Sequence, residues 1–505
     1  MESENNKLNK FNEMVSSRSF FFPSAEIYPT NFAGFYEYGP IGNKIKINII
    51  DFWRNQFVKK NNFFEISGSI ILPEAVFKAS GHLENFNEAI GFCTKCKTVY
   101  RLDKLLTSKL NKEVPENLEL EDYIKLIKEN NIVCDNCKGN LGNFSKFNLM
   151  SSINVGVGNE NKGYLRGETC QSIFLDFLRV YKTSRENLPI GISQHGKVYR
   201  NEIAPRNGLL RGREFEQLES ELFFDKDKLN DVDLQPFLNK KIRFKLLKDN
   251  AEKDYTIKEI IDQKITLGNL ITYYLYLNQE FLENIGFNHE NFRFREVPDD
   301  DRAFYSLQGF DLEIKLNDQW IELFCTNYRG DHDLLGHSKG SKKDLSVSID
   351  GKKILPHVLE VSSIGLDRLF YLLLYNSFET KIVDKEERNI LHLKPKISPY
   401  FVGVLPLVKK DGLLEKAQDV FKSIQENTFG VFDIFFDEKA SIGRRYARLD
   451  EIGTNFCITI DYQTMEDDTV TIRDRETFAQ KRISIKQLPE ILLKLYEEKV
   501  SFEGI

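Results

Sequence analysis

The segment around residues 197–221 constrains the fold of this chain more than any other segment. It places Arg200 and Glu202 before a short loop rich in proline, glycine and arginine, and the run REFEQLESE follows that loop. Alternating apolar residues on both sides predict two β-strands joined by the loop. Arginine can bind a phosphate through two hydrogen bonds, a carboxylate can accept from an amino group, and an aromatic ring can stack on a base. The hairpin therefore indicates a nucleotide site, although a salt-bridged surface hairpin would have a similar composition.

Length and composition indicate a multidomain globular protein. A chain of 505 residues is too long for one hydrophobic core and predicts about two to four domains. No apolar stretch reaches the ~18 residues that cross a membrane, and the charged start lacks a signal-peptide core. We therefore expect a cytoplasmic protein. The net charge of −6 disfavours a protein that coats nucleic acids in general, but it leaves room for a local basic surface that binds one RNA.

The seven cysteines are of two kinds. Four of them form two CxxC pairs: Cys93, Cys96, Cys134 and Cys137. Two such turns can bring four thiolates to a tetrahedral zinc ion, and the bound ion lets a small inserted segment fold without a large core. Disulfides or free thiols are the alternative, but no secretory signal indicates an oxidising compartment. The other three cysteines are isolated and are expected to be packing residues: Cys170, Cys325 and Cys457.

The spacing of apolar residues predicts the main elements. We expect a long amphipathic helix over residues 41–60, followed by a strand over 63–72 that ends at Pro73. Further helices are expected over 116–130 (Glu116 to Asn130), 268–285 and 364–375, and strands with turns over 304–334. From Ser398 onward, alternating strands and helices predict a separate α/β domain.

Six segments, in order, resemble the class II glycyl-tRNA synthetases of the homodimeric, archaeal or eukaryotic-like type. The hairpin resembles motif 2 of class II synthetases, and its REFEQLESE run is similar to the glycyl enzymes. The other segments are GFYEYGPIGNKIKINIIDFW (34–53), SGH (80–82) with YLRGETCQSIF (164–174), WIELFCTNYRGDHDL (320–334), PHVLEVSSIGLDRLFY (356–371) and SIGRRYARLDEIGTNFCITID (441–461). The fourth of these resembles motif 3, and the last resembles an anticodon-binding domain.

The resemblance implies an α+β fold, in which an antiparallel-sheet catalytic domain carries a cysteine-knuckle insertion and is followed by a C-terminal α/β anticodon-binding domain. The expected domains are residues 1–395 (catalytic), 83–147 (insertion with the cysteines), 226–295 (a second, irregular insertion that interrupts the catalytic sheet and has no assigned role) and 396–505 (anticodon binding). The helix–strand–proline unit at 41–73 forms the dimer interface in class II synthetases, so the resemblance implies a homodimer. An ordinary core helix would show the same spacing.

The resemblance also implies a reaction: glycine is joined to ATP, and the glycyl group then passes to the terminal adenosine of tRNA-Gly. Arg200 would grip the α-phosphate, Glu202 would read the adenine amino group, and Phe215 would stack on the base. Arg368 would cover the other face of adenine and reach the γ-phosphate, and Glu322 would bind Mg²⁺ and the ATP tail. Arg200 and Arg368 are thus the implied catalytic residues. The other residues implied in ATP binding are Asn201, Leu210, Arg211, Arg213, Leu323 and Gly365.

Glycine recognition poses a separate problem, because only an ammonium and a carboxylate can be grasped and every larger amino acid must be rejected. A cluster of carboxylates around the ammonium fits this need, although like charges in one pocket repel each other. The residues implied in glycine binding are Arg101, Glu168, Phe215, Gln217, Glu219, Glu360, Ser362 and Ser363. For the last two, it is open which serine takes the family role, because the segment Glu360–Gly365 is one residue longer than the family pattern.

Other departures from the family pattern affect the pocket. Gly167–Ser172 stands where Pro-Glu-Thr-Ala-Gln-Gly is usual, Cys325 where glycine is common, and Asn455 where proline is common. Two alternatives to a glycyl enzyme follow. One is another class IIa synthetase, such as the prolyl, threonyl or histidyl enzyme, against which the GETCQ and REFEQLESE segments argue. The other is a non-catalytic synthetase-like accessory protein, which typically loses the ATP-binding arginines that this chain retains.

Overall fold

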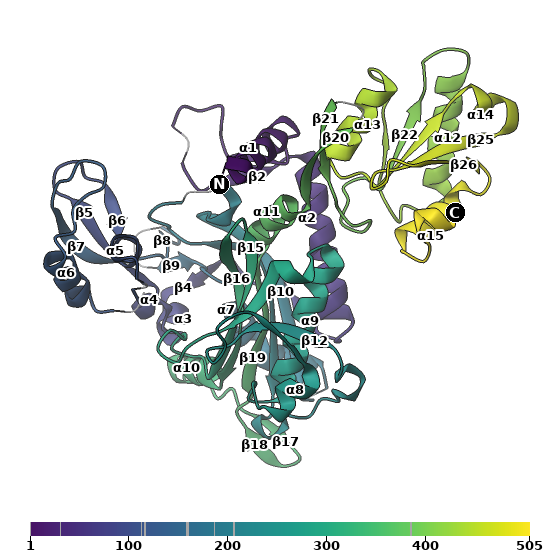
Figure 1. Cartoon of the computed structure of the whole chain (residues 1–505). Coiled ribbons are helices and arrows are strands. Elements are labelled where there is room, and N and C mark those ends of the chain that lie inside the picture. Colours follow the sequence, from purple (N-terminus) through teal and green to yellow (C-terminus); the bar gives the residue numbers. More distant parts are fainter. Residues whose placement is uncertain are drawn as a thin grey trace.

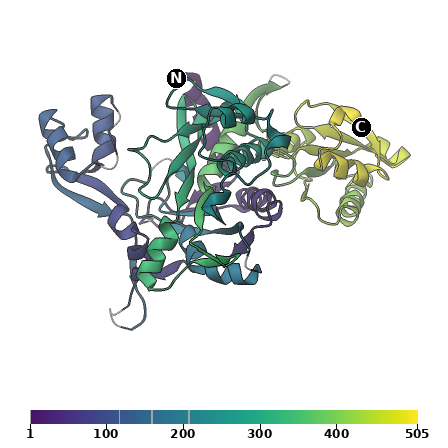
Figure 2. The ribbon, with the colours of Figure 1, turned by 90° about the horizontal axis from the view of Figure 1, so that it is seen from below.

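The molecule has a central sheet with helices on both faces, a small insertion at one end and a C-terminal domain at the other (Figures 1 and 2). The computed structural model describes residues 2–30, 32–112, 114–115, 118–157, 161–185, 187–205, 208–383 and 386–505. Among these residues, no helix is both long and apolar enough to cross a membrane.

The central sheet has nine strands in the order β13-β12-β14-β15-β16-β19-β11-β10-β3. Five consecutive strands of this sheet are antiparallel to one another: Gln308–Leu316 (β15), Gln319–Gly330 (β16), His357–Gly365 (β19), Glu214–Phe224 (β11) and Ile190–Tyr199 (β10). Side chains alternate between the two faces of β11. Leu218 and Leu222 enter the main core, whereas Phe223 packs in a second core on the opposite face. Glu219 and Glu221, at odd-numbered positions, share that second face.

Helices cover the two faces of this sheet. The main core contains residues of Glu2–Ser17 (α1), Pro40–Trp53 (α2), Asn269–Ile285 (α9) and Leu366–Ser377 (α11). The second core contains residues of Cys170–Thr183 (α7) and Leu334 of His332–Ser341 (α10). The helix predicted over 41–60 is confirmed as α2 and a π-helical continuation over Arg54–Lys59, with Ile45, Ile49 and Trp53 buried. The predicted helices over 268–285 and 364–375 are also confirmed, and α1 was not predicted.

The strand predicted over 63–72 is wrong as a single element. Phe64–Ile66 (β3) lies beside β10 in the central sheet, whereas Ile71–Pro73 (β4) pairs with Lys162–Leu165 (β9), which also pairs with Ser152–Asn154 (β8). The chain changes sheet at Gly68. A Cβ atom at this position would lie 2.2 Å from Oγ of Ser172, and the Gly68 amide donates to Gln194. The close approach of the backbone to α7 therefore requires glycine and ends the strand.

The segment 226–295 extends the sheet, and the prediction that it interrupts the sheet is wrong. It supplies α9, Ile257–Asp262 (α8) and three strands at one edge: Lys241–Lys245 (β12), Lys253–Thr256 (β13) and Phe292–Glu296 (β14). Ile242, Phe244 and Phe294 are fully buried in these strands. Their alternation with lysine and arginine is the pattern of a strand with one buried face. Each alternating stretch is short, and the many lysines around it make the pattern hard to recognise in the sequence.

The insertion is a three-stranded sheet of Asn87–Cys93 (β5), Val99–Arg101 (β6) and Leu141–Asn148 (β7), packed against two helices, Leu102–Leu110 (α5) and Leu120–Glu129 (α6). The helix predicted from Glu116 begins at Leu120, and Glu116 itself lies outside the described residues. Two short helices, Glu74–Ala79 (α3) and His82–Asn85 (α4), lead into this sheet.

The C-terminal domain has its own hydrophobic core. Its five-stranded sheet has the order Ile434–Phe436 (β23), Val402–Pro406 (β22), Phe456–Ile460 (β24), Thr469–Asp474 (β25) and Gln480–Ser484 (β26). The first three strands are parallel, and the last two pairings are antiparallel. The helices are Leu413–Asn427 (α12), Ile442–Glu451 (α13), Tyr462–Asp467 (α14) and Leu488–Tyr496 (α15). The alternating pattern predicted from Ser398 onward is therefore confirmed, whereas the predicted domain boundaries remain predictions.

Candidate active site

The hairpin β10–β11 forms the middle of the site. Tyr199 pairs with Glu214 at the end of the hairpin next to the connecting loop, and Arg200 follows directly. The loop beyond carries Glu202 and Arg211; Arg206 and Asn207 of this loop lie outside the described residues. Asn201 is exposed, and its backbone N–H donates to the backbone carbonyl of Leu149.

Arg200 contacts both aromatic and acidic residues of the site. Its Nε donates to the carbonyl of Gly167 at 3.1 Å, and its Nη2 donates to Oε1 of Glu168 at 3.2 Å. The guanidinium carbon is 5.5 Å from the ring centroid of Phe215 and 5.0 Å from that of Phe86. Two rings and two hydrogen bonds therefore fix the direction of this cation.

Arg211 and Arg213, on the far side of the loop, donate to Glu202. Arg211 donates from Nε to Oε2 of Glu202 at 2.6 Å and from Nη2 to Oε1 of Glu88 at 3.3 Å. Arg213 donates to the backbone carbonyls of Glu202 and Ala33 at 3.0 and 3.2 Å. A carboxylate that is 7% exposed is thus held by a charged hydrogen bond, and the loop is fastened on both sides.

Arg368 joins the loop to the central sheet from the first turn of α11. Its Nε donates to the carbonyl of Leu210 at 3.3 Å, and its Nη1 donates to the carbonyl of Glu322. Gly365 is the residue before the helix. Asp367, the residue before Arg368, accepts from the hydroxyl of Tyr38 at 2.7 Å, which ties α11 to the segment before α2. Arg200, Arg211, Leu210, Glu322 and Arg368 are therefore brought together, whereas Leu323 is buried.

Three carboxylates predicted to bind glycine lie together beyond Arg200. Besides its contact with Arg200, Glu168 has its Oε2 atom 3.2 Å from Nε2 of His82. Glu219 accepts a hydrogen bond from the hydroxyl of Thr169 at 2.9 Å. Glu360 accepts from Asn327 at 3.0 Å and from Arg329 at 2.9 Å.

The protonation of these carboxylates differs. Burial acts to raise the pKa of Glu168, but His82 and Arg200 hold this pKa well below its usual range. Burial, with the charges of Glu360 and Glu168, raises the pKa of Glu219 to about 8. Burial also raises the pKa of Glu360, against the charge of Arg329. A cation entering this pocket would find one ionised carboxylate and others that gain most from its charge.

The two serines of the motif 3 segment face opposite sides of the sheet. Ser363 pairs with Glu219 in the register and accepts from Nε2 of Gln217 at 2.7 Å. Ser362 points to the other face, where Nε1 of Trp53 donates to it at 3.3 Å. The register shifts between Ser220 and Glu221, so that Val361 has no partner on β11. This β-bulge absorbs the one extra residue and places Glu360 and Ser363 on the same face.

Comparisons with known proteins agree with this geometry. The sequence profile of the tRNA synthetase class II core domain (G, H, P, S and T) matches residues 154–390, and that of the anticodon binding domain matches residues 402–495. The chain is 35% identical to the glycine–tRNA ligase of Methanothrix thermoacetophila, over 97% of each chain. It is 36% identical to that of Thermococcus gammatolerans, over 96% of this chain and 97% of the relative, and 34% identical to that of Archaeoglobus fulgidus, over 96% of each. This chain belongs to the glycine–tRNA ligase family.

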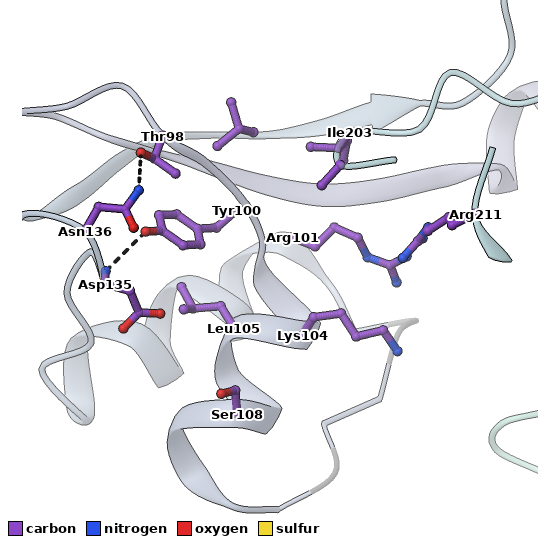
Figure 3. A pocket seen from close by; sticks show the side chains of 12 residues that line it. Thr98, Tyr100, Arg101, Lys104, Leu105, Ser108, Asp135, Asn136, Ile203 and Arg211 are labelled. Atoms are coloured by element: carbon purple, nitrogen blue, oxygen red, sulfur yellow. Dashed lines mark hydrogen bonds between the residues drawn. The ribbon is translucent and has the colours of Figure 1, made fainter. Parts of the chain in front are cut away.

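Arg101, which was predicted to bind glycine, pairs with other acidic residues than Glu168, Glu219 and Glu360. Its Nη1 donates to Glu88, and its Nε and Nη2 donate to Asp103 at 3.1 and 2.7 Å. Arg101 lines a cavity of about 470 Å³ between the insertion and the motif 2 loop. Figure 3 shows Arg101 and Arg211 extending toward each other across this cavity. Glu88 accepts from both arginines and so connects Arg101 to Arg211.

The sequence analysis missed Arg329, which is 2% exposed. It donates to both oxygens of Asp333, at 2.7 and 2.9 Å, and to Glu360. Its guanidinium carbon lies 3.8 Å from the ring centroid of Tyr305. Arg329 and Asp333 lie four residues apart within the quoted segment 320–334. Their position in that segment is the sequence feature that could have pointed to them. His82 was quoted in the SGH segment without a role.

Glu322 has acidic neighbours on β15 of this glycine–tRNA ligase fold. It pairs with Glu313 in the register, and the buried Asp311 lies two residues further along β15. Burial, with the charge of Glu322, raises the pKa of Asp311 to about 6. Carboxylate oxygens are suitable ligands for Mg²⁺, and Asp311 had not been singled out from the sequence.

The four knuckle cysteines converge in the insertion. Their sulfur atoms all lie within 4.8 Å of one another, and all seven cysteines of the chain are free. A Cβ atom at Gly139 would lie 3.1 Å from Sγ of Cys93 and 3.3 Å from Sγ of Cys137, so the backbone closes tightly around the thiols. Four thiols at this spacing can hold one tetrahedral ion. The isolated Cys170 and Cys457 are buried, and Cys325 is half-buried.

Proposed function

We propose that this chain is a glycine–tRNA ligase that activates glycine with ATP and transfers the glycyl group to the terminal adenosine of tRNA-Gly. The observation that carries the proposal is the position of Arg200, between the nucleotide side of the site and the carboxylates Glu168, Glu219 and Glu360. A full-length relationship to glycine–tRNA ligases supports it.

In the first step, a carboxylate oxygen of glycine attacks the α-phosphorus of ATP and pyrophosphate leaves. Both reactants are anionic, so the site must neutralise charge and fix geometry, and no protein nucleophile is needed. Arg200 can contact the α-phosphate while it stays beside Glu168. Glu202 would accept from the adenine amino group, with Phe215 and Arg368 on either side of the base. Bound Mg²⁺ would neutralise phosphate charge, and Glu322 with Asp311 would hold it.

The carboxylates and the filled pocket would select glycine. Glu168, Glu219 and Glu360 would surround the ammonium, with Ser363 and Gln217 beside them. Phe174 and Tyr305 pack around Arg329 at the same place. A side chain larger than hydrogen would meet these groups, so rejection would be steric.

Three further assignments belong to the proposal. The four knuckle cysteines would hold a structural zinc ion, and the C-terminal domain would bind the anticodon of tRNA-Gly. Two copies would pair through the unit of α2, β3 and β4, which exposes the apolar residues Ile47, Phe64, Ile70 and Ile71. The protein would work in the cytoplasm, where tRNA is charged.

ATP–pyrophosphate exchange with each amino acid in turn tests this function. We expect exchange with glycine alone, and its loss in Arg200→Ala. Arg179→Ala on α7 is the matched control, because this arginine is 83% exposed and has only a 3.9 Å ion pair with Asp176. Exchange with another amino acid would favour a different class IIa synthetase. ATP binding without any exchange would favour a non-catalytic accessory protein.

A further inference from the structure

Glu221 is a buried carboxyl group next to the proposed glycine pocket. It has no role in the function proposed above. It lies two residues beyond Glu219 on the same face of β11, and it pairs with Glu360 across β19. Its side chain is fully buried, and neither carboxylate oxygen has a hydrogen-bond partner among the described residues. An ionised carboxylate in such a place would be strongly destabilising.

Few cations are available to the carboxyl groups of the pocket. Arg329 forms ion pairs with Asp333 and Glu360, and Arg200 forms an ion pair with Glu168. No cation in the described structure forms an ion pair with Glu219 or Glu221 within 4 Å. The charged and titratable groups that face Glu219, Glu221 and Glu360 from the surrounding elements are Arg166, Glu168, Cys170, Tyr305, Cys325, Arg329 and Asp333. Behind Glu168 lie His82 and Arg200.

The two glutamates of β11 differ in what could stabilise their charge. Glu219 accepts from the Thr169 hydroxyl at 2.9 Å and lies opposite Ser363, so its ionised form has polar partners. Burial raises the pKa of Glu221 well above its usual range, against the charge of Arg329. With a pKa of about 8, Glu219 is also mostly protonated at neutral pH in the empty site.

We propose that Glu221 is a permanently neutral residue beside the glycine pocket, and that the glycine ammonium displaces one proton from Glu219 on binding. The O–H bond of the Glu219 carboxyl breaks, the proton goes to solvent, and the carboxylate pairs with the ammonium. Burial and the charges of Glu360 and Glu168 keep Glu219 protonated until a cation arrives. This inference rests on the proposed function, because it takes the ammonium of glycine as the entering cation.

Calorimetric titration of the full-length protein with 5′-O-(glycylsulfamoyl)adenosine, a stable analogue of glycyl-adenylate, tests the proposal. Titration at pH 7 in phosphate and in Tris gives the number of protons released from the difference in heat. We expect about one proton per site, and none with the acetyl analogue, which lacks the amino group. A count of zero for the glycyl compound would overturn the inference.

Two variants separate the roles of the glutamates. Glu219→Gln should bind the glycyl analogue without releasing a proton. Glu221→Gln should still release about one proton and bind within about threefold of the unaltered protein, because an amide resembles a neutral carboxyl. Loss of proton release in Glu221→Gln would overturn the assignment of the proton to Glu219.

A stability measurement checks that Glu221 is neutral. A carboxyl group that stays protonated in the folded protein costs stability as pH rises above about 4.5, because the unfolded chain loses its proton there. Glu221→Gln should therefore raise the thermal midpoint, by an amount that grows between pH 5 and pH 8; a gain independent of pH would contradict a neutral Glu221.

The kinetics give an independent readout. The KM for glycine in the exchange reaction should fall by about tenfold per pH unit between pH 6 and 7. Exchange with glycine but no proton release would leave the proposed function standing and reject this inference. Absence of both exchange and analogue binding would reject the function itself.

Discussion

Arg211 donates a 2.6 Å hydrogen bond to Glu202, and this contact joins two residues that are proposed to bind opposite ends of ATP. Glu202 is proposed to accept from the adenine amino group, and Arg211 or Arg213 would hold the outer phosphates. Glu88 holds Arg211 from the other side, at 3.3 Å. ATP binding must therefore exchange these protein contacts of Arg211 for phosphate contacts, and the loop that carries Arg211 has to adjust as the nucleotide enters.

Arg211→Ala should raise the KM for ATP by about 10- to 100-fold, because a hydrogen bond to a charged group contributes about 1.5–3 kcal/mol. The KM for glycine should change much less, since Arg211 contacts none of the carboxylates around the ammonium. Exchange kinetics at varied ATP and glycine measure both constants. Arg179→Ala should leave both unchanged, and an unaltered KM for ATP in Arg211→Ala would contradict the role of Arg211.

The cysteine cluster predicts a metal-dependent insertion. Cys134→Ser should reduce bound zinc, measured by inductively coupled plasma mass spectrometry, from about one ion per chain to a small fraction. Hydrogen exchange should accelerate in β5, β6 and β7 and stay unchanged in the central sheet, because the insertion has a small core of its own.

Cys457→Ala is the control for the cysteine experiment, since this buried thiol lies in the C-terminal domain. It should retain the zinc and the exchange pattern of the insertion. A purified protein without metal but with a fully protected insertion would show that the four thiols have no structural ion.

His337 predicts a loss of stability in acid. Burial lowers its pKa to about 4, partly opposed by the charge of Asp333, and its Nε2 lies 3.2 Å from Oε1 of Gln171. The unfolded chain takes up a proton at this position near pH 6.5, whereas the folded chain does so only near pH 4. Its contribution is therefore present above pH 6.5 and is lost as pH falls toward 4, by at most about 3 kcal/mol.

The thermal midpoint of His337→Gln should fall less steeply between pH 6.5 and 4 than that of the unaltered protein. His289→Gln is a control of opposite sign. Burial acts to lower the pKa of His289, but hydrogen bonds to Asp254 and Glu283 raise it overall. That group stabilises the fold below pH 6.5 and stops doing so above its raised pKa. Equal acid slopes for His337→Gln and the unaltered protein would contradict the buried neutral state of His337.

The elements that could be predicted from the sequence are those with a local period. The hairpin, α2, α9 and the alternating C-terminal domain each show it over many residues. The strand predicted over 63–72 failed because one glycine, which lets the backbone approach α7, sends its two halves into different sheets. The strands β12 and β14 were missed because each is short and its exposed face consists of the same lysines and arginines as the surrounding segment.

The site was predictable only as far as its residues lie in the quoted motifs. Arg200, Glu202 and Arg368 could be singled out in this way. Which motif 3 serine faces Glu219 could not, because this depends on a β-bulge that forms only when β19 pairs with β11. Arg329 was equally hidden, since an arginine in a sequence gives no sign that it will be buried beside Glu360.

The last prediction concerns the edge of the central sheet. β3 is the final strand at its end of the sheet, with β10 on one side, and Phe64 on this strand is 41% exposed. Ile71 in β4, a few residues further along the chain, is also exposed. Such an edge is a place where another chain can add.

If two copies pair here, Phe64→Asp should turn the dimer into a monomer at micromolar concentration, because it removes an apolar contact of about 1.5–3 kcal/mol and adds a charge. Light scattering coupled to size-exclusion chromatography measures the mass. Phe429→Asp is the control, since Phe429 is 90% exposed and lies between α12 and β23 of the C-terminal domain, outside the central sheet that contains β3. If Phe429→Asp alone dissociated the dimer, the interface would lie on the C-terminal domain. A monomeric unaltered protein would exclude the pairing altogether.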